Sequence, residues 1–97
     1  MRLSFDQQSL IRRVIAESLG AQTRVWLFGS RANDQAQGGD IDLLAETPGR
    51  VSLGRVRLAT VRLEQNLGIP VDVLTTSPEQ PDSPMVNIAR LTGVALV

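Results

Sequence analysis

The sequence predicts an α/β (α+β) fold in which helices cover a small mixed β-sheet. Apolar residues recur at helical spacing in two segments, and short runs rich in β-branched and aromatic residues indicate strands. The two kinds of segment alternate along the chain, which is typical of a sheet with helices packed against it. The chain has 97 residues, so we expect one domain spanning residues 1–97.

The first two predicted elements are a helix and a strand. Ser4 is a candidate N-cap with Gln7 three residues later, which is the spacing of a capping box. Apolar residues then follow a helical period, so we expect a helix over residues 5–19. Residues 23–29, with the sequence TRVWLFG, indicate the first strand.

The segment after the first strand is polar and ends in a glycine pair. Residues 30–37 are compatible with a short helix that starts at Ser30, and Gly38-Gly39 would be its terminating turn. The sequence DIDLLAE over residues 40–46 indicates the second strand. The rest of the chain predicts, in order, a helix, a strand, a short helix and a final strand over residues 52–67, 71–76, 85–91 and 94–97.

The composition restricts the chemistry that the chain can perform. It contains no Cys and no His, and all ten basic residues are Arg. These absences exclude thiolate nucleophiles, imidazole bases, a lysine-dependent P-loop and Schiff-base chemistry. Any catalysis must use carboxylates, hydroxyls, backbone amides, arginines or a hard metal ion.

Charge and hydropathy argue against two kinds of partner. Ten acidic residues balance the ten arginines, so we expect no bulk binding of nucleic acid. No apolar run approaches the roughly 18 residues that a membrane span needs, so we expect no membrane partner. The N-terminus lacks a signal-peptide pattern, and we therefore expect a cytoplasmic protein.

Three aspartates occupy similar positions in two predicted strands. Side chains alternate between the faces of a strand, so Asp40 and Asp42 are expected to point the same way. Asp72 lies between two valines in the next strand and would join them if the strands are neighbours. Clustered carboxylates repel one another, and a divalent cation such as Mg²⁺ would neutralise them. The alternative is that Asp40 is a turn residue and Asp42 lies at an exposed end of the sheet.

A glycine and a serine lie between the first strand and the possible short helix. Gly29 allows a ligand to approach the backbone closely, and amides at the start of a helix attract phosphate. Ser30 adds a hydroxyl donor, although it could equally serve only as an N-cap.

The segments GSRA, GGDIDLL and VDVL, in this order, resemble the nucleotidyltransferase superfamily with the DNA polymerase β-like fold. Within it, the chain resembles the antitoxin-like minimal nucleotidyltransferase (MNT) domains of prokaryotes. The resemblance covers nearly the whole chain and includes the tail, IARLTGVALV. There are two departures. Gly39 stands where the family commonly has a serine, and the segment between Ser30 and Asp40 is slightly shorter than usual.

The resemblance implies a metal-dependent transfer of a nucleoside monophosphate from a nucleoside triphosphate, with ATP as the expected donor. Gly29 and Ser30 would hold the phosphates. Asp40 and Asp42 would ligate two Mg²⁺ ions. Asp72 would be the third catalytic carboxylate, a metal ligand that also helps to activate the acceptor hydroxyl.

The resemblance also implies a partner. Minimal nucleotidyltransferases are often paired with a small helical toxin ribonuclease of the HEPN type, and some add nucleotides to it. We therefore expect a hydroxyl on such a protein to be the acceptor. The alternatives are a catalytically weak module that acts by binding its partner, and a nucleotide-binding regulator. An arginine-rich helix face is a candidate for docking an acidic partner, although such faces are commonly just solvated; its arginines are Arg50, Arg55, Arg57 and Arg62.

Overall fold

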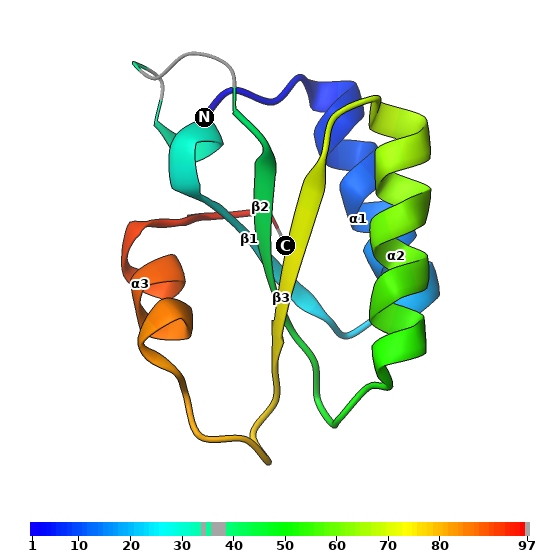
Figure 1. The fold of residues 1–97 in the computed structure, drawn as a ribbon, viewed down its shortest axis with the longest axis vertical. Helices are drawn as coiled ribbons and strands as arrows, with labels where there is room; N and C mark the ends of the chain where they lie inside the picture. Colours follow the sequence, from blue (N-terminus) through cyan, green and yellow to red (C-terminus); the bar gives the residue numbers. More distant parts are fainter. Residues whose placement is uncertain (34, 36–38, 97) are drawn as a thin grey trace.

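The computed structural model describes residues 1–33, 35 and 39–96 (Figure 1). Its elements, in chain order, are α1 (Phe5–Leu19), β1 (Arg24–Phe28), the 3₁₀ helix η1 (Gly29–Ala32), β2 (Ile41–Glu46), α2 (Leu53–Leu67), β3 (Val71–Thr76), α3 (Pro84–Thr92) and β4 (Val94–Ala95). The capping box expected at Ser4 and Gln7 is present at the start of α1. None of the helices in this part of the chain has the length and apolar character needed to cross a membrane.

The four strands form one mixed sheet in the order β3-β2-β1-β4. β1 runs antiparallel to both β2 and β4, whereas β2 and β3 are parallel. The parallel pair is joined by α2, which provides the long crossover that parallel neighbours require. The helix-covered mixed sheet expected from the sequence is therefore confirmed.

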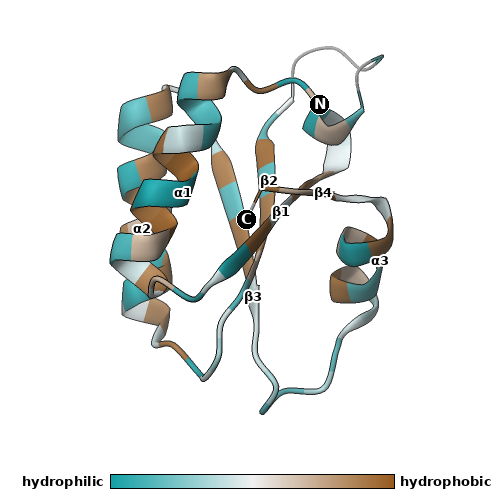
Figure 2. Ribbon diagram, turned by 180° about the vertical axis from the view of Figure 1, so that it is seen from behind, coloured by the Kyte–Doolittle hydropathy of each residue, from teal (hydrophilic) through white to brown (hydrophobic). Residues whose placement is uncertain are grey.

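The two faces of the sheet are covered by different helices. α1 and α2 lie together against one face and α3 lies against the other (Figures 1 and 2). Alternate residues of β2 separate accordingly: Ile41, Leu43 and Ala45 belong to the main core beneath α1 and α2. Leu44 instead packs with Val86 of α3 in a smaller cluster. Because side chains alternate along a strand, Asp42 shares the α3 face with Leu44.

An ion-pair cluster holds α3 against one end of the sheet. Arg90 of α3 forms salt bridges with Glu46, the last residue of β2, and with Asp82 in the preceding loop. Glu46 lies on the α3 face, four residues beyond Asp42. The cluster is therefore at the opposite end of the strand from the aspartates.

Several element boundaries differ from the sequence prediction by one or more residues. β2 begins at Ile41, so Asp40 immediately precedes the strand instead of lying within it. Of the expected short helix over residues 30–37, the described part contains the 3₁₀ turn η1, which starts at Gly29, and residues 34, 36 and 37 lie outside the described residues. Gly38 of the expected glycine turn lies outside the described residues, as does Val97 of the expected last strand. β4 comprises Val94 and Ala95, the register partners of Leu27 and Trp26, and the N–H of Leu96 also donates to the carbonyl oxygen of Val25 at 2.8 Å.

Candidate active site

Asp42 and Asp72 are neighbours across the parallel strands β2 and β3. They are direct register partners, and the adjacent pair in the ladder is Ile41 with Val71. Side chains at paired positions of neighbouring strands lie on the same face, so both carboxylates project from the α3 face. Asp40 is exposed and lies one residue before β2 begins.

Two contacts fix the start of β3 and therefore the position of Asp72. The backbone N–H of Val71 donates a hydrogen bond to Oε2 of Glu64 on α2, at 2.9 Å. The N–H of Ile41 donates to the carbonyl oxygen of Pro70, at 3.0 Å. These bonds set the register that brings the two aspartates together.

The electrostatic environment of Asp42 disfavours its charged form. Partial burial raises the pKa of Asp42 above its ordinary value of 3.8, and the carboxylates of Asp72 and Asp40 raise it further. The three aspartates are therefore close enough to interact. A positive charge placed among them would reverse this cost, because an opposite charge favours the ionised carboxylate.

The donor set fits a hard divalent cation. All three side chains offer carboxylate oxygens, which are the ligands that Mg²⁺ prefers. Among the described residues, however, no three acidic side chains are already gathered into a metal-binding group. Asp42 and Asp72 form the paired part of the site, and Asp40 would be the third ligand when a cation binds.

Gly29 leaves space for the Asp42 carboxylate. Its φ angle of +72° lies in the left-handed region, and a Cβ atom added there would be 2.3 Å from Oδ2 of Asp42. Glycine is the residue that meets both requirements, because it has no Cβ to collide with the carboxylate and it adopts a positive φ without strain. The Asp42 carboxylate therefore occupies the space that a side chain at position 29 would fill.

The Ser30 hydroxyl does not cap η1. The N-cap residue of η1 is Phe28, and no side chain forms a capping hydrogen bond there. The Oγ of Ser30 lies against Gly39, where an added Cβ would be 2.2 Å from it. Gly39 also has a positive φ, of +92°. The capping role that the sequence left open for Ser30 is therefore wrong.

Two arginines join η1 to the segments beside it. Arg2 donates through Nη2 to the carbonyl oxygen of Ser30 at 3.0 Å and through Nε to that of Asn33 at 3.2 Å. Arg31 donates through Nε to the carbonyl oxygen of Gly39, at 3.1 Å. These hydrogen bonds connect η1 to the N-terminal segment through Arg2 and to the residue before Asp40 through Arg31.

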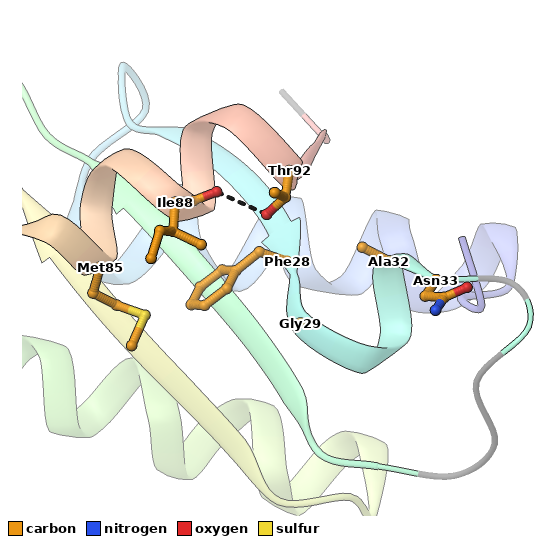
Figure 3. A pocket seen from close by; sticks show the side chains of 7 residues that line it. All are labelled: Phe28, Gly29, Ala32, Asn33, Met85, Ile88 and Thr92. Atoms are coloured by element: carbon orange, nitrogen blue, oxygen red, sulfur yellow. Dashed lines mark hydrogen bonds between the residues drawn. The ribbon is translucent and has the colours of Figure 1, made fainter.

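Two adjoining cavities open on this side of the sheet. The first, of about 410 Å³, is lined by Asp42 and Asp72 together with Phe28, Val73, Leu74 and Met85. The second, of about 400 Å³, is lined by Phe28, Gly29, Ala32, Asn33, Met85, Ile88 and Thr92 (Figure 3). Phe28 and Met85 line both cavities, so a ligand at the carboxylates would have apolar space beside it.

The sequence interpretation proposed glycine, serine and aspartate residues for this region and did not propose its apolar ones. The predicted site residues Gly29, Asp42 and Asp72 are brought to one place. Phe28 and Met85 were not predicted, and the only available signal for Phe28 was its position directly before Gly29. Met85 is brought in by α3, whose position relative to the sheet cannot be read from local sequence.

The arginine-rich face of α2 is used differently from the sequence expectation. Nε of Arg55 donates to the carbonyl oxygen of Ser18 at 3.0 Å. Arg62 donates to Oγ of Ser18 at 3.0 Å and forms a salt bridge with Glu17 at 2.7 Å. These two arginines contact α1 within the chain, and the docking of an acidic partner by the four arginines stays a prediction.

Comparison with known proteins identifies a family and a shared fold. The nucleotidyltransferase domain family matches residues 9–92. The fold is similar to a chain of the MntA–HpeT toxin–antitoxin structure, a mutant with two Asp-to-Glu substitutions, at a TM-score of 0.77 and 13% identity; the match covers 93% of this chain and 71% of that one.

A second solved structure contains tri-AMPylated Shewanella oneidensis HEPN toxin in complex with MNT antitoxin. The TM-score is 0.74 and the identity 15%, over 94% of this chain and 69% of that one. No curated protein sequence gives a match. At these identities the solved structures establish the fold, and the family match, which covers most of the chain, establishes the relationship. The chain belongs to the nucleotidyltransferase domain family.

Proposed function

We propose that the chain is a metal-dependent nucleotidyltransferase that moves a nucleoside monophosphate from ATP to a hydroxyl on a protein partner. The observation that carries this proposal is the pairing of Asp42 and Asp72 on one face of the sheet, with the Asp42 carboxylate against Gly29. This arrangement puts two acidic groups next to the glycine–serine turn. Asp40, one residue before β2, is the third carboxylate of the proposed site.

The reaction would be an in-line displacement at the α-phosphorus. The acceptor oxygen forms a bond to that phosphorus, the bond to the bridging oxygen breaks, and pyrophosphate leaves with the electron pair. Asp72 helps to remove the proton of the acceptor hydroxyl, while Gly29 and Ser30 hold the phosphates. Two Mg²⁺ ions bound by Asp40, Asp42 and Asp72 would supply charge neutralisation and polarise the attacking hydroxyl.

A protein acceptor is favoured by one of the structurally similar complexes. One structurally similar complex contains an AMPylated HEPN toxin bound to an MNT antitoxin. We propose that this chain likewise acts as an antitoxin on a HEPN-type partner, in the cytoplasm.

Pyrophosphate release distinguishes an enzyme from a binding module. The chain, its candidate partner and ATP should release pyrophosphate when Mg²⁺ is present and none when the metal is chelated. Omitting the partner should reduce the rate, because much of the acceleration comes from holding the acceptor in line. A partner that binds tightly without any metal-dependent release of pyrophosphate would favour the alternative, inhibition by binding alone.

Ser30→Ala should lower nucleotide use without weakening the fold. Its hydroxyl caps no helix, so we expect the free energy of unfolding to change by less than about 0.5 kcal/mol. The control is Ser52→Ala, because the Ser52 hydroxyl accepts from the N–H of Arg55 and caps α2. That control should lose about 1 kcal/mol of stability and keep its activity. Thermal unfolding and the KM for ATP test both variants; the reverse pattern would make Ser30 a structural residue.

A further inference from the structure

We propose that the apolar cavity between η1 and α3 holds the purine base of the nucleoside triphosphate. This inference rests on the proposed function and extends it to a part of the substrate that the aspartates do not contact. The cavity is the one lined by Phe28, Gly29 and Ile88, and we refer to it as the base cavity.

The base cavity begins where the proposed phosphate and metal site ends. Gly29 lines it and also lies against the Asp42 carboxylate. Phe28 and Met85 separate it from the cavity that contains Asp42 and Asp72, since they line both. A triphosphate bound at the aspartates and the Gly29–Ser30 turn would therefore have its nucleoside next to this opening.

The lining of the base cavity suits a flat aromatic ligand. The side chains of Phe28, Met85 and Ile88 point towards one another between β1 and α3, and Ala32 and Asn33 lie on the opposite side, at η1 (Figure 3). An aromatic ring and polarizable or aliphatic side chains are favourable contacts for the faces of a base. The volume of about 400 Å³ lies within the ordinary range for small-ligand pockets.

The base cavity has few polar side chains, and some of their hydrogen-bonding atoms already have partners within the protein. The hydroxyl of Thr92 donates to the carbonyl oxygen of Ile88 at 2.7 Å, and Oδ1 of Asn33 accepts from the N–H of Gln35 at 2.9 Å. Apolar contact with the faces of the base would therefore contribute more to binding than hydrogen bonds to the edge of the base. A purine offers more ring surface than a pyrimidine, so ATP and GTP should bind more tightly than CTP and UTP.

Two exposed apolar residues of α3 provide a matched test. The side chain of Ile88 is 52% exposed and lines the base cavity, whereas that of Leu91 is 86% exposed and lines neither of the two cavities described above. Alanine is the best helix former, so neither Ile88→Ala nor Leu91→Ala should unfold α3. Circular dichroism confirms the fold of each variant before binding is measured.

Calorimetric titration with Mg-ATP and with Mg-tripolyphosphate, which has no base, tests the proposal. Ile88→Ala should weaken ATP binding by about fivefold to tenfold, because apolar contact area is lost. Its tripolyphosphate affinity should stay within about twofold of the parent, and Leu91→Ala should leave both ligands unaffected.

Three results would contradict the proposal that the base cavity binds the base. These are unchanged ATP affinity in Ile88→Ala, an equal loss in Leu91→Ala, or an equal loss of tripolyphosphate binding. Unchanged ATP affinity combined with weakened partner binding would assign the cavity to the protein partner. If the parent binds neither ligand, the proposed function fails, and the base cavity fails with it.

Discussion

Asp42→Asn is expected to lower nucleotide transfer by roughly a thousandfold, which corresponds to about 4 kcal/mol of transition-state stabilisation. The variant keeps the shape of the side chain and removes the charge that would hold the cation. The metal-free variant should be at least as stable as the parent at neutral pH. The reason is that burial and the neighbouring carboxylates of Asp72 and Asp40 penalise ionised Asp42.

The pH dependence of this stability difference has a definite sign. The pKa of Asp42 is raised in the folded protein, so protonation of Asp42 favours folding. The favourable contribution is present at acid pH below the ordinary carboxyl value of 3.8 and is lost as the pH rises through the folded pKa. The advantage of Asp42→Asn should therefore be largest at neutral pH and should shrink as the solution is acidified.

Thermal unfolding measured with and without Mg²⁺ checks the Asp42→Asn prediction. Mg²⁺ should raise the melting temperature of the parent more than that of the variant, since a ligand stabilises the state that binds it. Glu79→Gln removes one exposed carboxylate outside the site and controls for the change in net charge. A variant that unfolds in the absence of metal, or that transfers nucleotides at the parent rate, would contradict the role given to Asp42.

Gly29→Ala should lose both stability and activity. The left-handed φ of +72° is costly for alanine, by about 1–2 kcal/mol. The new Cβ would also lie 2.3 Å from Oδ2 of Asp42, so the carboxylate must move. A displacement of about 1 Å at a catalytic group can cost roughly a hundredfold in rate, and we expect at least that loss.

Gly68→Ala separates these two effects. Gly68 ends α2 with a φ of +68°, which is nearly the same backbone conformation, and an added Cβ would meet nothing within 4 Å. This control should lose similar stability and retain its transfer activity. Equal activity losses in both variants would mean that the effect of Gly29→Ala comes from general destabilisation and not from the Asp42 carboxylate.

The fold could be predicted largely because its signals are local. The helical periodicity of α1, its capping box and the strand-like runs around Val25 and Val73 all depend on nearby residues. The alternation along β2 also predicted that Asp42 would point away from the main core. These expectations depend on the spacing of apolar residues within a single helix or strand, and this spacing is visible in the sequence.

The remaining features depend on contacts between distant segments. Local sequence patterns do not indicate that Arg55 and Arg62 bind Ser18 on α1, because the crossing of two helices is set by tertiary packing. The base cavity likewise depends on where α3 lies, which is set in part by the ion pairs of Arg90 with Glu46 and Asp82. Hydrophobic periodicity identifies a helix but does not say which part of a sheet it leaves uncovered.

The measurement that tests the central claim most directly is the intact mass of the partner protein after incubation with this chain, ATP and Mg²⁺. The protein encoded beside the chain is the first candidate partner. The proposed function predicts that the partner gains one or more AMP units with the parent chain and none with Asp42→Asn or without Mg²⁺. A partner that forms a stable complex, keeps its original mass, and is inhibited equally by the parent and by Asp42→Asn would contradict nucleotide transfer as the function of this chain.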